Sequence, residues 1–157
     1  MRADIEHIDA RCAAYDIAHP TTFCYPGYSY GPEAAVVLRQ RGFRFARRGV
    51  APEYAYDDEG GRGPAYTPDV HAPLSIPTTG ASGPKWGFDD FLWALDQARD
   101  GQVAVLTFHG VPDLDHPWVH TEPDQFEQYI TYLRDNEFTV LALRDLEKYT
   151  ELPHQDL

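Results

Sequence analysis

A histidine that follows the most apolar stretch of the chain is the first candidate for chemistry. Residues 103–108 form a nearly continuous apolar run, which is typical of a strand buried on both faces of a parallel sheet, and His109 and a glycine come directly after it. Parallel α/β folds bind ligands at the C-terminal ends of their strands. Because histidine side chains exchange protons near neutral pH, the position favours general acid or base work. A histidine bonded only to neighbouring backbone is the competing interpretation.

The loop expected after this strand, residues 111–120, holds two further histidines and two aspartates. His116 and His120 are four residues apart, close to Asp113 and Asp115. Two histidines one helical turn apart are common zinc ligands. A proline between them argues against a helix, so we favour a loop that covers a pocket. We therefore assign no metal ligand here and expect this chain to bind zinc only weakly.

Cys24 is the one candidate nucleophile that the expected topology places at a strand end. Paired with His109 as a base, its thiol would serve a metal-free Cys–His hydrolase. An isolated cysteine in such a position is more often a small apolar filler. We favour the packing interpretation and keep the Cys–His pair as a third hypothesis.

Two tryptophans, Trp86 and Trp118, fall in expected loops rather than in helices. Aromatic rings beside a pocket can stack on sugar rings, and loop tryptophans also serve as ordinary lids. We include both residues among the candidate substrate contacts.

Helices and strands alternate along the sequence. Helices are predicted at residues 2–15, from Pro32 to the glycine at 42, from Phe88 toward Gly101, from a cap at Thr121 through Leu133, and at 143–149. Strands are predicted at 21–25, 43–46, 103–108 and 138–142, with a brief one at 74–76. The first helix should bury Ile5, Ile8, Cys12 and Tyr15 on one stripe. Residues 49–83 otherwise lack a regular pattern.

This alternation predicts an α/β fold with mostly parallel strands and right-handed crossovers. The 157 residues suit a single domain spanning 1–157. Four or five strands are too few to close a barrel of eight. Because the order begins with a helix, as if a preceding strand were missing, we expect an exposed sheet edge and self-association into a homo-oligomer.

Charge and composition exclude several partner classes. Lys plus Arg number 13 and Asp plus Glu 25, which gives a formal net charge of −12. Such a chain repels the phosphates of nucleic acids and anionic membranes. No apolar run approaches the roughly 20 residues of a membrane-spanning helix, and the N-terminus lacks a signal peptide. The two cysteines form no disulfide framework, so we expect a cytoplasmic protein.

Three segments resemble motifs of the polysaccharide deacetylase (NodB-homology) family. Residues 22–28 (TFCYPGY), followed by a helix and residues 41–47 (RGFRFAR), resemble the family's third motif. Residues 105–109 (VLTFH) resemble its final motif, an apolar strand that ends in a catalytic histidine. Residues 132–146 (YLRDNEFTVLALRDL) resemble its closing helix and strand. The order and spacing of these segments carry the resemblance over nearly the whole chain.

The resemblance implies the C-terminal part of a distorted (β/α) barrel that hydrolyses non-peptide C–N bonds, such as the N-acetyl groups of a carbohydrate. It assigns His109 as the general acid that protonates the leaving amine and the backbone N–H of Gly27 as an oxyanion donor. Tyr25 and Pro26 would shape the substrate groove. Cys24 stands where the family's motif has an arginine. In the family a divalent metal, often zinc, activates the attacking water.

The sequence departs from the family at the residues that hold this metal. The family's Asp-Asp pair after an early strand and its His-Ser/Thr-x-x-His motif are not found. The chain starts about where the second motif would end, so its metal ligands are expected to be missing and the chain alone to be inactive. Its substrate would be a carbohydrate or another small amide. The alternative is a catalytically inactive carbohydrate-binding module that keeps the groove.

Overall fold

The structure is a computed structural model that describes residues 1–55 and 61–150, and its contacts divide the chain into two compact units. Unit 1 comprises Met1–Arg48, Ala72–Ile76 and the described residues from Leu143 onward. Unit 2 comprises the described residues of Gly49–His71 and Pro77–Ala142. The expectation of a single domain over residues 1–157 stays a prediction.

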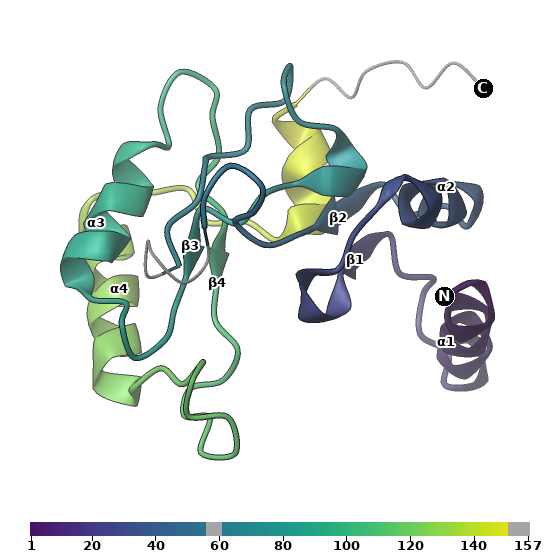
Figure 1. The fold of residues 1–157 in the computed structure, drawn as a ribbon, viewed down its shortest axis with the longest axis horizontal. Coiled ribbons are helices and arrows are strands. Elements are labelled where there is room, and N and C mark those ends of the chain that lie inside the picture. The colour runs from purple at the N-terminus through teal and green to yellow at the C-terminus, as the bar shows by residue number, and fades with distance from the viewer. Residues whose placement is uncertain (56–60, 151–157) are drawn as a thin grey trace. The chain divides into compact units, whose positions relative to one another are not determined.

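Unit 1 combines two helices with a pair of parallel strands (Figure 1). Its regular elements are α1 (Arg2–Ala14), β1 (Thr22–Cys24), α2 (Pro32–Gln40), β2 (Phe45–Arg47) and the 3-10 helices η1 (Pro26–Tyr28), η2 (Pro73–Ser75) and η3 (Leu143–Lys148). Strand β1 pairs with β2 in a register that places Cys24 opposite Arg47. Pro32 occupies the first turn of α2, and Gly42 leaves this helix at φ +82°, so the punctuation predicted from the sequence is confirmed.

The hydrophobic core of unit 1 lies between its helices and strands and consists of Ile5, Tyr25, Leu38, Phe43, Ala46 and Leu74. Two predictions for this unit are wrong. Helix α1 buries Ile5 alone, whereas Ile8 and Tyr15 are exposed. The expected strand at 74–76 is mostly 3-10 helix, and only Ile76 forms a parallel bridge to Arg47.

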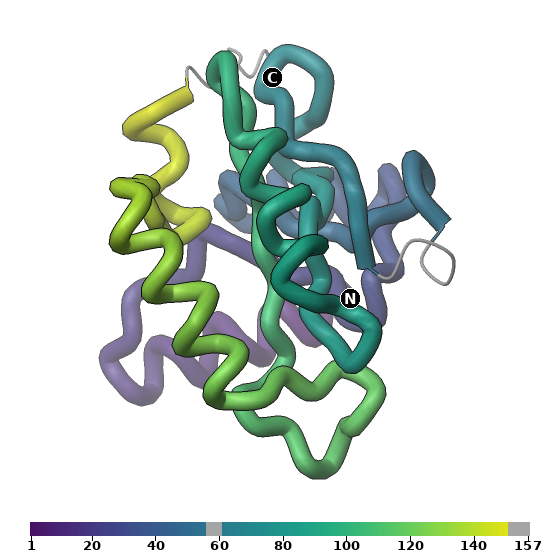
Figure 2. Tube along the Cα trace, turned by 90° about the vertical axis from the view of Figure 1, so that its left-hand side faces the viewer, coloured from purple at the N-terminus to yellow at the C-terminus, as the bar shows by residue number. Residues whose placement is uncertain are grey.

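Unit 2 packs two helices against a second pair of parallel strands (Figures 1 and 2). Its elements are β3 (Gly80–Ala81), α3 (Phe88–Asp96), β4 (Leu106–Thr107) and α4 (Pro123–Asp135). The apolar spacing that predicts α3 and α4 is confirmed at most positions, because both helices turn apolar side chains toward one core. That core consists of Trp86, Phe91, Ala94, Leu95, Tyr129 and Leu133. The exception is Ile130, which was expected on the stripe of α4 and is exposed. Across the two helices, the rings of Phe91 and Tyr129 stack at 4.4 Å.

The strand expected over 103–108 is shorter and less buried than predicted. Only Leu106–Thr107 is regular strand, and all six residues are half-buried. The remainder still bonds to neighbouring chain, because Val103 forms an antiparallel bridge with Tyr66 and the Val105 carbonyl accepts the N–H of Thr79 at 2.8 Å. Tyr66 and Thr79 come from the segment 49–83, which lacks a regular sequence pattern. They take the place of the extended parallel strands that the sequence pattern implied.

Two further predictions for unit 2 are wrong. Residues 138–142 form no strand, and Val140 is exposed while Phe138 packs beside the core. Thr121 does not cap α4, which begins at Pro123. Instead Thr121 is buried, and its hydroxyl lies 2.7 Å from that of Ser82. A buried hydroxyl needs a partner, and here a second hydroxyl supplies it.

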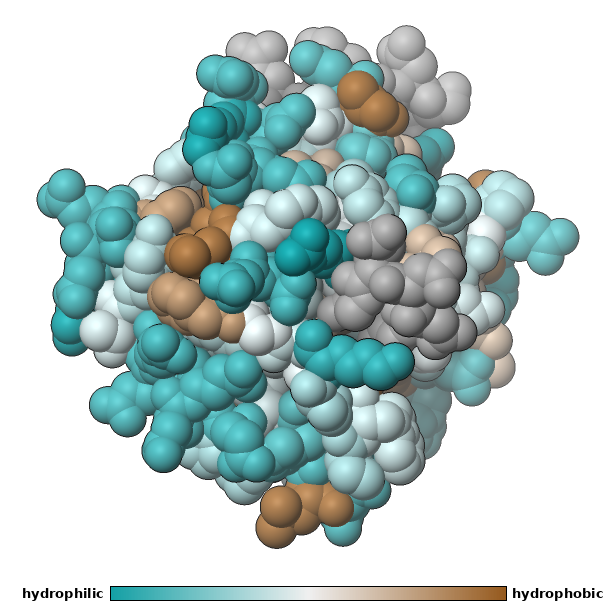
Figure 3. Space-filling model, turned by 60° about the vertical axis from the view of Figure 1, so that its left-hand side comes forward, coloured by the Kyte–Doolittle hydropathy of each residue, from teal (hydrophilic) through white to brown (hydrophobic). Residues whose placement is uncertain are grey.

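The described residues therefore form a mixed α/β structure with two short parallel strand pairs and no closed barrel. None of the described helices is long and apolar enough to cross a membrane. The face in Figure 3 carries mostly hydrophilic side chains, with small separate hydrophobic patches between them.

Candidate functional site

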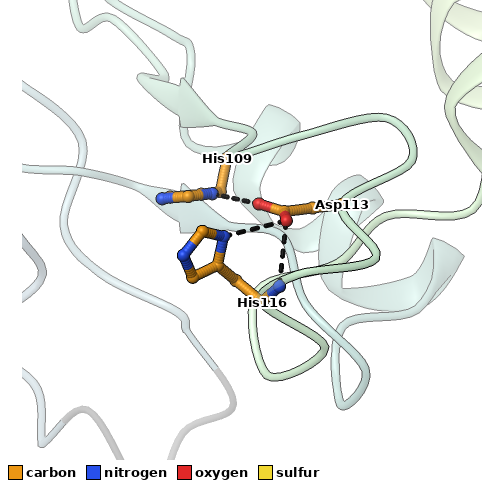
Figure 4. Close-up of side chains that lie close together, drawn as sticks. All are labelled: His109, Asp113 and His116. Carbon is orange, nitrogen blue, oxygen red and sulfur yellow. Dashed lines mark hydrogen bonds and ion pairs between the residues drawn. The ribbon is translucent and has the colours of Figure 1, made fainter.

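The loop that follows β4 gathers two histidines around one aspartate: His109, Asp113 and His116 (Figure 4). The loop is closed at its base by a parallel bridge between Gly110 and His120. The N–H of Thr121 also donates to the Gly110 carbonyl at 3.3 Å. Because its two ends are joined, the loop can hold side chains from different turns at one place.

The Asp113 carboxylate contacts both imidazole rings through separate oxygens. Its Oδ2 bonds to Nδ1 of His109, and its Oδ1 lies 2.9 Å from Nδ1 of His116. The same Oδ1 accepts the backbone N–H of His116 at 3.0 Å. The two rings meet edge to face with centroids 5.0 Å apart. One carboxylate thus fixes the orientation of both histidines.

Two neighbours hold Asp113 in turn. The Nδ1 of His120 accepts the backbone N–H of Asp113 at 2.9 Å, and Nε2 of His120 lies 2.9 Å from the Glu122 carboxylate. Gly110 leaves the space that Asp113 occupies, because a Cβ at this position would lie 2.7 Å from Cβ of Asp113. The glycine after His109 is therefore required by close packing with the aspartate.

Opposing effects act on the Asp113 carboxyl group. Burial tends to raise its pKa, but the hydrogen bonds from His109 and then from His116 outweigh burial, so the pKa of Asp113 is lowered. The side chain of Asp113 is 11% exposed, whereas those of His109 and His116 are 54% and 48% exposed. A charged, shielded carboxylate therefore supports two accessible imidazoles.

This arrangement suits either proton transfer or metal binding. A carboxylate on Nδ1 favours the tautomer with a proton on that nitrogen, and Nε2 of His109 points away from Asp113 in Figure 4. Nε2 is then the atom that accepts or donates a proton. Alternatively, the three ligand atoms lie within 4.8 Å of one another and could hold a metal ion.

The two tryptophans predicted to contact substrate lie in different environments. Trp118 is 68% exposed, and its ring meets that of His116 edge to face at 5.4 Å. Trp86 is only 2% exposed and belongs to the core of unit 2, although it also borders an open pocket of about 770 Å³. The other pocket residues are Gly83, Pro84, His120, Glu122, Asp124, Gln125 and Gln128.

The candidate residues of the third motif form the turn after β1 in unit 1. Tyr25 is 2% exposed and donates its hydroxyl to the Leu74 carbonyl at 2.9 Å, so it is a core side chain. Pro26 and Gly27 are exposed, and Gly27 has φ +56°, a backbone conformation that glycine adopts without strain.

Cys24 of this turn is exposed and lies beside an arginine from the paired strand. The guanidinium of Arg47 contacts its Sγ and lies 5.2 Å from the centre of the Tyr28 ring. The parallel register of β1 and β2 produces this contact, because Cys24 and Arg47 are Cα partners. An arginine from β2 thus stands next to the position where the family's motif has its own.

Cys24, Tyr25, Pro26 and Gly27 belong to unit 1, whereas His109, Trp86 and Trp118 belong to unit 2. The convergence of the two groups on one substrate stays a prediction, as does the Cys24–His109 pair.

Sequence reasoning missed the grouping of His109, Asp113 and His116, because it paired His116 with His120. His120 instead faces Glu122 and the backbone of Asp113. The spacing carried a signal for this cluster, because Asp113 lies four positions after His109 and His116 lies three positions after Asp113. A short interval between potential ligands in a loop opened by glycine would have indicated the cluster.

Searches among protein-family models, curated proteins and solved structures gave no match to the chain.

Proposed function

We propose that the chain is part of a polysaccharide-deacetylase-like hydrolase that acts on non-peptide C–N bonds, such as the N-acetyl groups of a carbohydrate. The observation that carries this proposal is the bond from the Asp113 carboxylate to Nδ1 of His109 at the end of β4. It supports His109 as a general acid, because the largely shielded Asp113 carboxylate fixes the orientation of its ring.

Amide hydrolysis places two demands on such residues. Water loses a proton to a general base as its oxygen adds to the carbonyl carbon, which gives a tetrahedral oxyanion; the resemblance implies that this base belongs to the family's Asp-Asp pair, which is not among the residues of this chain. The C–N bond then breaks as the leaving nitrogen takes a proton. His109 Nε2 would deliver that proton, while Asp113 would act as a positioning residue. A positioned general acid typically contributes about 10²–10⁴-fold to the rate.

The oxyanion would be held by the turn of unit 1, as the family resemblance implies. The backbone N–H of Gly27 would donate to it, a role typically worth about 10²–10³-fold in rate. Arg47 supports this assignment, because its contact with Cys24 supplies a guanidinium where the sequence lacks the motif arginine. The two parallel strand pairs would belong to the C-terminal part of a distorted (β/α) barrel.

The metal of the family does not fit the residues of this chain. The nearest match to its histidine motif, residues 116–120 (HPWVH), has proline in place of Ser/Thr. Its histidines also diverge, since His116 faces Asp113 and His120 faces Glu122. We therefore assign no step of the reaction to that metal here and propose that another part of the complete enzyme binds it.

The test is acetate release from N-acetylglucosamine oligosaccharides by the longest polypeptide in which this sequence is encoded. His109→Ala should lower kcat by about 10²–10⁴-fold with little change in KM, because protonation of the leaving group matters mainly in the transition state. His7→Ala, on an exposed position of α1, is the matched control. Absence of acetate release, or an unchanged kcat in His109→Ala, would contradict the proposal.

The exposed Trp118 favours a second candidate, a catalytically inactive carbohydrate-binding module. A tryptophan that is 68% exposed beside His116 offers a flat face to a sugar ring. This candidate requires oligosaccharide binding that Trp118→Ala abolishes, together with no acetate release. Turnover by the wild-type protein would exclude it.

A further inference from the structure

The geometry points to a binding site for a divalent transition-metal ion formed by His109, Asp113 and His116. Each residue offers one ligand atom, and all of these atoms lie within 4.8 Å of one another. This is the one group of at least three potential ligands in residues 1–55 and 61–150. The site is distinct from the family's metal site, and it reverses our expectation from the sequence that the chain binds zinc only weakly.

The kinds of atoms select the class of ion. Zinc in proteins takes imidazole nitrogen and carboxylate oxygen at about 2.0–2.2 Å, with three protein ligands and a water in its open sites. Two Nδ1 atoms and one carboxylate oxygen supply such a set. Calcium and magnesium prefer sets made of oxygen alone. The site should therefore favour zinc, and cobalt in its place, over magnesium.

The loop already holds these atoms close together. Asp113 is fixed through its backbone N–H to His120, and His116 through its backbone N–H to Asp113. The bridge between Gly110 and His120 joins the two ends of the loop. Hydrogen-bond partners that hold metal ligands in place commonly change the metal affinity of a site by about 10–100-fold. We expect an effect of this size here. The ligand atoms therefore start close together, and a bound ion would replace the hydrogen bonds between Asp113 and the two imidazoles.

Metal binding and proton donation by His109 exclude each other. An ion on Nδ1 of His109 takes the place of the proton that this nitrogen shares with Asp113. The ion also separates the ring from the Asp113 carboxylate that would position it for proton transfer. Zinc should therefore inhibit hydrolysis through this loop, a consequence that rests on the proposed function, whereas the binding itself does not.

The test is titration of the purified chain with Co²⁺, followed by its visible absorption, and then displacement by Zn²⁺. We expect one ion per chain, bound at least about tenfold more weakly by His116→Ala and by Asp113→Asn. Mg²⁺ should not compete. Controls are His7→Ala on α1 and His154→Ala, which lies outside the described residues; both should keep wild-type affinity.

Circular dichroism of each variant separates loss of a ligand from loss of the fold, and His116→Gln gives a second, more conservative replacement. Binding that survives in both His116 variants, or that His154→Ala abolishes, would overturn the inference. Failure to detect any hydrolase activity would leave this result unaffected, because the titration measures binding alone.

Discussion

At Asp113, one carboxylate serves two imidazole rings and a backbone amide. The two histidine side chains face solvent, whereas the Asp113 carboxylate that orients them is largely covered. Charge-assisted hydrogen bonds of this kind are stronger than neutral ones. Asp113 is therefore the residue on which both the proposed proton transfer and the proposed metal site depend.

Gly110→Ala should displace this carboxylate without altering any polar group. The new Cβ would lie 2.7 Å from Cβ and 3.1 Å from Cγ of Asp113, so the aspartate must move. We expect at least about tenfold weaker Co²⁺ binding, because loss of the groups that position metal ligands typically lowers metal affinity by about 10–100-fold. Titration of the variant checks this. Gly31→Ala, where a Cβ meets nothing within 4 Å, should bind like the wild type.

Sequence reasoning located His109 but not its partners, and the reason is physical. A strand pattern followed by His-Gly indicates where a chain turns at a sheet edge. Which side chains converge in the next ten residues depends on the loop's own turns, and no periodicity encodes these. The contact between Arg47 and Cys24 was equally hidden, because it follows from the register between two strands that are separated by a helix.

Among the elements, helices were predicted better than strands. Helices α2, α3 and α4 carry local signals, a proline near the start or an apolar stripe, and the structure confirms them. Strands depend on partners distant in the sequence. The apolar residues 138–142 have the composition of a strand but no pairing, while Gly80–Ala81 pairs with β4 despite lacking a strand pattern.

Gly80→Ala should strain the junction between β3 and the core of unit 2. A Cβ there would lie 2.5 Å from Cη2 of Trp86 and 3.1 Å from a methyl carbon of Leu106. Overpacking of this kind costs about 1–3 kcal/mol of unfolding free energy. Urea denaturation measures the loss. The double variant Gly80→Ala with Trp86→Phe should recover part of it, and an additive loss in the double variant would contradict this explanation.

Tyr129 on α4 gives a pH dependence. Burial, and then the charge of Asp90, raise the pKa of Tyr129 to about 12, from its ordinary 10.0. Between these values the unfolded chain has lost the proton and the folded one keeps it, so stability falls as pH rises from 10.0 to about 12. Below pH 10.0 the contribution is fully present.

Tyr129→Phe should therefore flatten the fall in stability between these pH values, as urea denaturation at a series of pH values would show. Part of the slope should remain, because burial also raises the pKa values of Tyr25 and Tyr66. Tyr132→Phe, on the same helix, is the control and should keep the wild-type slope. Identical slopes in the wild type and Tyr129→Phe would contradict the assignment.

At the scale of the whole molecule, the residues that the family resemblance assigns to the reaction are divided between the units. Gly27, the proposed oxyanion donor, and Arg47 belong to unit 1, and His109, the proposed proton donor, belongs to unit 2. Each unit has its own hydrophobic core. A substitution at Gly27 should therefore affect the proposed oxyanion contact and leave the core of unit 2 intact. A substitution at His109 should affect the proposed proton transfer and leave the core of unit 1 intact.

The net charge of the molecule determines which ions gather near its surface. The formal charge of −12 favours cations over anions near the surface, which agrees with the proposed cation site. At physiological ionic strength such fields decay over about 8 Å, so local contacts in the loop after β4 must supply the selectivity.

The most direct test of this account is the tautomeric state of three histidines, measured by ¹⁵N NMR at about pH 9, above the usual histidine range. We predict a proton on Nδ1 of His109 and His116, because each of these nitrogens bonds to the Asp113 carboxylate. His120 should show the opposite tautomer, because its Nδ1 accepts the N–H of Asp113. Asp113→Asn should shift His109 and His116 toward the Nε2–H form and leave His120 unchanged. His109 found as the Nε2–H tautomer in the wild type, with no response to Asp113→Asn, would contradict the account.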